Sequence, residues 1–277
     1  MKSHLVCYAT CDFEEGRRRL VASARRFGIH EVHSWNRAAV ERADFYPENR
    51  AILDRPRGSG YWLWKPYMIE HILKQLPAGE LLYYIDAGVE IIRDLSPLAE
   101  FATHKGGILT FAGHYDDVAV PGPNICRRWT KRDCFVLMGC DEPRYHEAQM
   151  LDASLVVLRK TERSLAFVRE WRSYCSDARI VTDDANVCGK DNLPGFIDHR
   201  HDQSVLSLLA LRHGLEVFRH PSQFGNHLKP EPLREPGEIL GHPYGAKGLC
   251  HNSPYPTLLD HHRMGRSMRL LLDKQLG

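Results

Sequence analysis

The 277-residue sequence lacks several features that would assign a protein to a class at once. It contains no run of about 18 apolar residues, so we expect no transmembrane helix. Its first ten residues, MKSHLVCYAT, carry too short an apolar run for a secretory signal. The eight cysteines include no CxxC pair, which argues against a zinc ribbon or a dithiol redox site. We therefore expect mostly reduced cysteines and a cytoplasmic protein.

The sequence also lacks a strong excess of either charge. Its formal net charge is +2, with 37 lysines and arginines against 35 aspartates and glutamates. This balance argues against a nucleic-acid partner. Apolar content of 43% and charged content of 26% are ordinary for a globular domain, and peripheral association with a membrane is compatible with them. The composition does not predict an oligomeric state.

Three signatures of nucleotide-binding and hydrolytic sites are missing. No GxGxxG follows the first expected strand, which argues against a dinucleotide-binding site, and no GxxxxGK[ST] of a P-loop is present. The nucleophile motif GxSxG is absent too, because Gly58-Ser59-Gly60 does not fit it. Dinucleotide binding, P-loop chemistry and α/β-hydrolase chemistry thereby lose their main support.

What is present is an alternation of apolar strands with amphipathic helices. Expected strands cover His4–Thr10, Glu31–Trp35, Leu81–Ile85, Gly107–Ala112, Ala153–Leu158 and Leu215–Phe218. Expected helices cover Phe13–Phe27, Tyr67–Leu76, Leu95–Phe101, Thr161–Cys175 and His201–His213, with a basic helix from about Arg263. This order predicts a single α/β domain, Rossmann-like, with a mixed, mostly parallel sheet flanked by helices. We expect residues 113–150 to be irregular, and loops of that length often bind ligands or cover an active site.

The most informative stretch is LLYYIDAGVEII, from Leu81 to Ile92. Its apolar run is typical of a strand buried on both faces, and it stops at Asp86, before Ala87 and Gly88. A carboxylate followed by small residues at a strand end lets a ligand approach the backbone. If the strand continued, Asp86, Gly88 and Glu90 would share one face. The alternative is that Asp86 only caps a turn.

A second stretch, RPRGSGYWLWKP, runs from Arg55 to Pro66. Glycines mark a loop that leads into the Tyr67–Leu76 helix, and Lys65 stands at the helix start. A helix N-terminus beside a glycine-rich loop suits an anionic group. The alternative places the tryptophans in the core and Lys65 on the surface.

A third stretch contains Asp202 and Gln203. These residues directly follow His199, Arg200 and His201. Asp is favoured at helix caps, so a purely structural role for Asp202 stays open. Asp152 precedes another buried strand and is followed by small residues. Together with Asp86, these side chains are the candidates for polar chemistry.

Four segments together resemble nucleotide-sugar-dependent glycosyltransferases of the GT-A fold. The segments are the first strand ending in Ala9-Thr10, Gly60-Tyr61-Trp62-Leu63-Trp64-Lys65-Pro66, Tyr84-Ile85-Asp86-Ala87-Gly88, and Asp198-His199-Arg200-His201-Asp202-Gln203-Ser204. The second resembles a segment of bacterial and viral polysaccharide glycosyltransferases. The last, with Leu151-Asp152-Ala153-Ser154 upstream, is similar to retaining glycogenin-like enzymes and lipopolysaccharide galactosyltransferases. The resemblance spans roughly residues 4–220, and residues 221–277 would form an extension that wraps the active site.

The resemblance implies a hexosyltransferase that moves sugar from a nucleotide-diphosphate sugar, such as a UDP-sugar, to a glycan or lipid-linked hydroxyl acceptor in polysaccharide or lipopolysaccharide synthesis. It assigns Asp202, Gln203 and Asp152 to catalysis, with a slight preference for retention of the anomeric configuration. It assigns Thr10, Trp64, Lys65, Asp86, Ala87 and Gly88 to donor binding.

The sequence departs from this family at the metal site. The second carboxylate of the family's DxD motif is replaced by Gly88, which cannot chelate. A Mn²⁺ or Mg²⁺ ion would then take Asp86, with Glu90 or a tail histidine (His227, His242 or His251) as a further ligand. The alternative is a metal-independent enzyme in which Lys65 and nearby arginines neutralise the diphosphate. Two rival classes also stay open: a noncatalytic nucleotide-sugar binding protein, and a metal-dependent phosphoesterase or nucleotidyltransferase.

Overall fold

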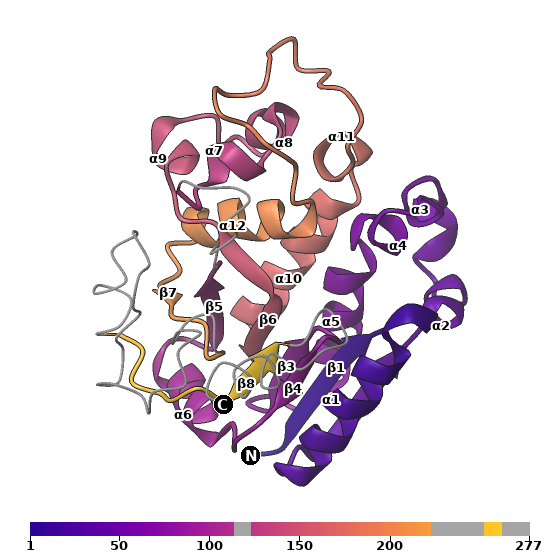
Figure 1. Cartoon of the computed structure of the whole chain (residues 1–277), viewed down its shortest axis with the longest axis vertical. Helices are drawn as coiled ribbons and strands as arrows, with labels where there is room; N and C mark the ends of the chain where they lie inside the picture. Colours follow the sequence, from indigo (N-terminus) through magenta and orange to yellow (C-terminus); the bar gives the residue numbers. More distant parts are fainter. Residues whose placement is uncertain (114–122, 223–251, 262–277) are drawn as a thin grey trace, which may run out of the picture.

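The computed structural model describes residues 1–113, 123–222 and 252–261, and its centre is a six-stranded sheet of order β2-β1-β3-β6-β5-β7 (Figure 1). The strands are β1 (Ser3–Tyr8), β2 (Glu31–Trp35), β3 (Leu81–Ile85), β5 (Ile108–Ala112), β6 (Leu151–Arg159) and β7 (Val217–Phe218). Strand β6 runs antiparallel to both of its neighbours, and every other pair in the sheet is parallel. The expected mixed, mostly parallel sheet is confirmed.

Helices cover both faces of this sheet, because successive residues of each strand point to opposite sides. One face carries Val6 and Tyr8 of β1 and packs against α5 (Trp64–Gln75), α10 (Glu162–Cys175) and α12 (Asp202–Arg212). The other face carries Leu5 and Cys7 and packs against α1 (Glu14–Arg26) and α6 (Ser96–His104). Two apolar cores, one on each face, hold the three layers together.

Several short helices lie where sequence periodicity predicted little. They are α2 (Arg37–Glu41), α3 (Tyr46–Leu53), α7 (Cys126–Trp129), α8 (Arg132–Leu137), α9 (Pro143–His146), α11 (Ala178–Val181) and a 3-10 turn (Cys11–Phe13). Helices α7, α8 and α9 show that the prediction of an irregular 113–150 segment was wrong for about half of its described part. Each is too short to display a repeated 3.6-residue pattern. Figure 1 shows them gathered at one end of the molecule with α11.

The strand that begins at Leu81 ends at Ile85 and does not continue to Glu90. After the turn at Asp86–Gly88, β4 (Val89–Ile91) forms a separate two-stranded antiparallel sheet with β8 (Leu259–His261). In that sheet Glu90 lies opposite Asp260. The shared strand face expected for Asp86, Gly88 and Glu90 is therefore absent.

Only part of the predicted C-terminal extension can be compared with the structure. Residues 252–261 return to the core through β8, whereas His227, His242, His251 and the predicted helix from Arg263 lie outside the described residues. No helix in the described ranges has the length and apolar character needed to cross a membrane. Every cysteine in the same ranges is free.

The strand order creates a ligand-binding position at the carboxyl ends of β1 and β3. From β1 the chain moves to β2 on one side, and it later returns to place β3 on the other side. Connections that leave two adjacent parallel strands in opposite directions open a crevice between their carboxyl ends. Ala9 follows β1 and Asp86 follows β3, so both lie at this crevice.

Candidate active site

A cavity of about 910 Å³ opens at this crevice. It is lined by backbone and side chains that follow β1 and β3, by the loop before α5, by the start of β6, and by the start of α12. The sequence-predicted residues that line it are Thr10, Trp64, Lys65, Asp86, Ala87, Gly88, Asp152, Asp202 and Gln203. Glu90 is not among its lining residues. The fold thus brings together in one cavity residues from five segments that are distant in the sequence.

Lys65 lies at the centre of the charged groups. Its side chain is 3% exposed, so the alternative of a surface lysine is wrong. The Nζ atom lies 2.8 Å from Oδ2 of Asp202 and 3.8 Å from Oδ1 of Asp86. It also donates a hydrogen bond of 3.0 Å to the carbonyl oxygen of Ala153. A buried ammonium needs such partners, because leaving it unpaired would carry a large desolvation cost.

The pair formed by Lys65 and Asp202 sets the ionisation of both groups. Burial raises the pKa of Asp202 to about 6, and the charge of Lys65 opposes that rise. Burial lowers the pKa of Lys65, but the carboxylates of Asp202 and Asp86 outweigh it and leave the pKa above its ordinary value. Near neutral pH the lysine is protonated and Asp202 is mostly ionised. A carboxyl group that titrates this close to neutrality is suited to acid–base chemistry.

Asp202 does not act as the N-cap of α12. The N-cap is His201, whose side chain makes no capping hydrogen bond, and Asp202 is the first helical residue. The carboxylate of Asp202 is instead paired with Lys65. Its backbone carbonyl accepts a hydrogen bond of 3.0 Å from Nε1 of Trp171 in α10. The side chain of Asp202 therefore forms an ion pair and is not the N-cap of α12.

The two histidines before Asp202 anchor the loop that leads into α12. His199 Nε2 donates to the carbonyl of Ile180, and His201 Nδ1 donates to the carbonyl of Val181, each at 2.8 Å. Burial lowers the pKa of His201 to about 4 and holds that of His199 well below its usual value, so both rings are neutral at pH 7. The backbone φ of His201 is 52°, a left-handed conformation that these side-chain bonds stabilise.

Asp86 and Asp152 are each oriented by a neighbour. The hydroxyl of Tyr84 donates a short hydrogen bond to Oδ1 of Asp86, whose side chain is 22% exposed and reaches the cavity. The backbone N–H of Ser154 donates to Oδ1 of Asp152 at 2.6 Å. The register between β5 and β6 shifts beside Asp152, and a bulge of this kind re-aims side chains at a strand end.

Part of the cavity wall is a left-handed turn whose conformation the sequence analysis did not predict. From Gly58 to Trp62 every residue has a positive φ, including the non-glycine residues Ser59, Tyr61 and Trp62 at 54°, 52° and 57°. Each such residue costs about 1–2 kcal/mol relative to a right-handed conformation. Strain of this kind persists only where the surrounding structure enforces it, often at a functional site.

Packing around this turn holds an aromatic pair at the cavity. Tyr8 stacks on Trp64 with ring centroids 4.0 Å apart, and Trp64 Nε1 donates to the carbonyl of Gly58 at 3.0 Å. The hydroxyls of Tyr8 and Ser59 are hydrogen-bonded at 2.9 Å. Trp62 stacks on His201 with centroids 5.3 Å apart. The turn therefore joins the end of β1 to the start of α12 across the cavity.

Some lining residues had not been singled out from the sequence. They are Tyr8, Asp12, Phe13, Pro56, Arg57, Ser59, Val89, Gly113 and His261. Gly58 and Gly60 were the only local signal for the turn. His261 gave no signal, because it reaches the cavity only through the pairing of β8 with β4.

The donor set at the cavity fits a divalent cation that is only partly coordinated by protein. Gly88 offers no ligand, Glu90 lies outside the lining, and Asp86 belongs to no group of three close ligating side chains in the described ranges. The cavity is lined by four carboxylates and three cationic side chains, namely Asp12, Asp86, Asp152 and Asp202 with Arg57, Lys65 and Arg200. Mg²⁺ and Mn²⁺ are commonly bound through one or two carboxylates plus substrate phosphates and water. Asp86 could serve as that carboxylate.

Comparison with known proteins gives likenesses among solved structures alone. No family model matches the sequence, and no curated protein matches it. Among solved structures, the chain is similar to the apo form of mouse xyloside xylosyltransferase 1, with 11% sequence identity and a TM-score of 0.46. The match covers 96% of this chain and 99% of that chain. We therefore derive a function from the geometry of the cavity.

Proposed function

We propose that the protein is a glycosyltransferase that transfers a sugar from a nucleotide-diphosphate sugar to a hydroxyl acceptor. The observation that carries the proposal is the cavity at the β1–β3 crevice. In it, the aromatic pair of Tyr8 and Trp64 meets the carboxylate–lysine cluster of Asp86, Asp202 and Lys65. A ligand with an aromatic end and a polar, charged end matches such a cavity, and a nucleotide sugar has both.

The donor's base would lie near Thr10 at the end of β1, where the buried Tyr8–Trp64 pair and the half-buried Trp62 line the cavity. The diphosphate would extend toward Asp86, Ala87 and Gly88. Gly88 lacks a side chain, which leaves room for a phosphate close to the backbone. The sugar would then lie near Asp152, Asp202 and Gln203.

The proposed chemistry uses charge held in place before the reaction. A Mn²⁺ or Mg²⁺ ion bound at Asp86 would act as a Lewis acid on the diphosphate oxygens. Lys65 has its Nζ bonded to Asp202 and Ala153, so we assign it the role of keeping Asp202 ionised and oriented. The ionised carboxylate would stabilise positive charge at the anomeric carbon or accept a proton from the acceptor. Gln203 and Asp152 would hydrogen-bond the sugar hydroxyls.

The finer assignments are part of the same proposal. A UDP-hexose donor, a glycan or lipid-linked acceptor, and a role in surface polysaccharide or lipopolysaccharide synthesis follow from the resemblance of the motifs. The family of bacterial and viral polysaccharide glycosyltransferases and retaining glycogenin-like enzymes is proposed on that ground. We also propose that residues 1–220 form the core with the nucleotide-sugar site, that residues 221–277 form an extension, and that the protein is cytoplasmic.

The test is a thermal-shift screen of nucleotide sugars, each with and without Mn²⁺. A ligand that binds only the native state raises the melting temperature. We expect stabilisation by at least one nucleotide-diphosphate sugar, and little by the free sugar. Stabilising donors are then incubated with protein to measure hydrolysis and transfer. Binding without any turnover would indicate a noncatalytic binding protein, and absence of stabilisation by every nucleotide sugar would contradict the proposal.

A further inference from the structure

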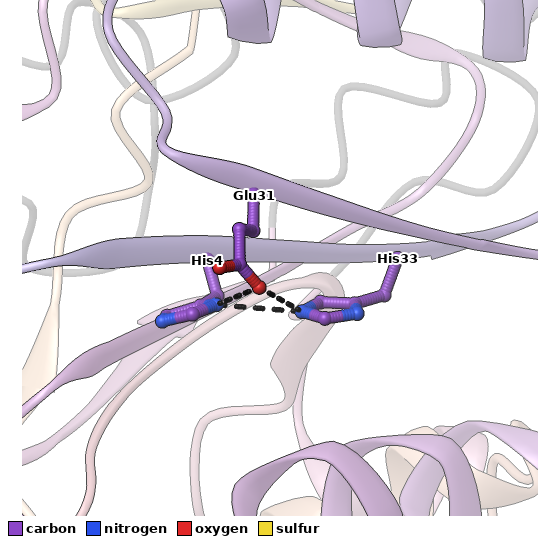
Figure 2. A group of neighbouring side chains, drawn as sticks. All are labelled: His4, Glu31 and His33. Carbon is purple, nitrogen blue, oxygen red and sulfur yellow. Dashed lines mark hydrogen bonds and ion pairs between the residues drawn. The ribbon is translucent and has the colours of Figure 1, made fainter. Parts of the chain in front are cut away.

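A second group of chemically active side chains lies on β1 and β2, away from the cavity. His4 of β1 pairs directly with Glu31 of the parallel neighbour β2, and Val6 pairs with His33. Glu31 and His33 are two residues apart, so they share one face of the sheet with His4. Figure 2 shows two ring nitrogens and one carboxylate oxygen facing one another. We call these residues the His4–Glu31–His33 cluster.

The spacing of the ligand atoms matches a metal site. His4 Nδ1 lies 3.4 Å from His33 Nε2 and 3.5 Å from Glu31 Oε2. His33 Nε2 lies 3.9 Å from the same carboxylate oxygen. In a tetrahedral Zn²⁺ site with bonds of about 2.0–2.2 Å, neighbouring ligand atoms lie about 3.3–3.6 Å apart. Two of the distances fall in this range, and the third needs only a small rotation of the exposed Glu31.

Glu80 provides the outer contact that such a site requires. It precedes β3, on the other side of β1, and its Oε2 lies 2.8 Å from His4 Nε2. An ionised carboxylate can only accept a hydrogen bond, so His4 Nε2 carries the proton. With the proton on Nε2, it is Nδ1 that remains to act as the metal ligand, and this atom faces the cluster. Metal-binding histidines commonly donate their second N–H to a carboxylate in this way.

His33 is also suited to ligation. Its Nε2 faces both Nδ1 of His4 and Oε2 of Glu31. A metal needs a neutral imidazole. Without a metal, His33 Nε2–H would donate to His4 Nδ1 across 3.4 Å, which is longer than most N–H hydrogen bonds.

We propose that His4 Nδ1, His33 Nε2 and the Glu31 carboxylate bind one Zn²⁺ ion, with Glu80 orienting His4 and water in the fourth position. The side chain of Glu31 is 53% exposed, so the ion can enter from solvent. Imidazole nitrogen with one carboxylate is a donor set that favours zinc over Mg²⁺ or Mn²⁺. Bound zinc would tie the edge strand β2 to β1. None of the four residues lines the cavity, so this site is independent of the proposed transfer reaction.

The experiment measures Zn²⁺ binding to tag-free, EDTA-treated full-length protein by calorimetry, with Co²⁺ absorption as a second probe of tetrahedral coordination. The variants are Glu31→Gln, His33→Gln and Glu80→Gln. His104→Gln, which changes an exposed histidine of α6, is the matched control. We expect one tight Zn²⁺ site in the wild type and in His104→Gln. Glu80→Gln should weaken binding by about 10–100-fold, and loss of a direct ligand should weaken it at least as much.

Circular dichroism checks that each variant is folded, and Glu31→Gln is the decisive one because this side chain is exposed. Zn²⁺ should also raise the melting temperature of the wild type and of His104→Gln, but not of Glu31→Gln. Equal Zn²⁺ affinity in the wild type, Glu31→Gln and His33→Gln would overturn the proposal, because the ion would then bind elsewhere. Absence of a tight site in the wild type would overturn it as well.

Discussion

The ammonium of Lys65 and the carboxylate of Asp202 lie 2.8 Å apart, and both side chains are almost fully buried at the cavity. A buried pair of this kind rarely adds net stability, because desolvation offsets the attraction. It does fix the position and charge of both groups. In the proposed reaction, the donor sugar lies next to the fixed negative charge of the Asp202 carboxylate.

Asp202→Asn separates this charge from the shape of the side chain. We expect transfer to fall by about 10²–10⁴-fold, because Asn can neither ionise nor accept a proton as a carboxylate does. Stability should fall as well, since removing one partner of a buried ion pair typically costs about 3–5 kcal/mol. Turnover per folded molecule and melting temperature are measured on the same protein. Asp191→Asn, in an exposed loop, is the control, and wild-type turnover in Asp202→Asn would exclude a catalytic role.

The pKa of Asp202, raised by burial to about 6, predicts two pH effects. If the ionised form is required, kcat/KM should rise with pH to a plateau above this value. Stability should change in the opposite sense. An unfolded Asp titrates near 3.9, so the folded protein holds the proton more tightly between about pH 4 and 6, and this group's contribution to the unfolding free energy falls as pH rises.

Lys65→Met checks the assignment of that pH dependence. The lysine opposes the rise in the pKa of Asp202, so its removal should move the acidic limb of the kcat/KM profile above 6. In Asp202→Asn the limb should disappear. An identical acidic limb in all three proteins would assign the titration to another group.

Asp86→Asn tests the proposed cation site. The amide keeps an oxygen that can accept from the Tyr84 hydroxyl, but it removes the charge that would bind a metal. We expect transfer to fall by about 100-fold or more, on the scale of losing one electrostatic contact in a catalytic site. EDTA should inactivate the wild type, and Mn²⁺ should restore it. Glu31→Gln should respond to Mn²⁺ as the wild type does, and full activity of EDTA-treated protein would indicate metal-independent transfer.

Gly60→Ala tests the strained turn beside the cavity. A Cβ atom at Gly60, where φ is 101°, would lie 2.6 Å from the Cα of Leu53. We expect a loss of about 1–3 kcal/mol from this overlap, beyond the cost of the left-handed conformation itself. Gly189→Ala is the matched control, because Gly189 also has a positive φ of 72° but nothing within 4 Å of an added Cβ. Equal losses of unfolding free energy in urea for the two variants would show that the overlap is relieved.

The sequence alone determined the features that depend on neighbouring residues. The apolar run of β3 and its stop at Asp86 were predicted, because burial on both faces leaves a continuous apolar pattern. The α/β order and the five longest described helices followed from periodicity in the same way, whereas the short helices did not. The candidate residues around Lys65, Asp86, Asp152 and Asp202 could be selected as chemically suitable types beside strand ends and helix starts.

Only the tertiary structure decided which of these residues meet. Lys65 and Asp202 come from different helices, and their ion pair depends on how α5 and α12 pack on the same face of the sheet. Glu90 was separated from Asp86 because the chain turns into a second sheet, a change set by pairing with β8. The His4–Glu31–His33 cluster exists because the register of β1 and β2 aligns two short segments. Strand register and helix packing each depend on many contacts between residues that are distant in the sequence. No local pattern of residues therefore encodes them.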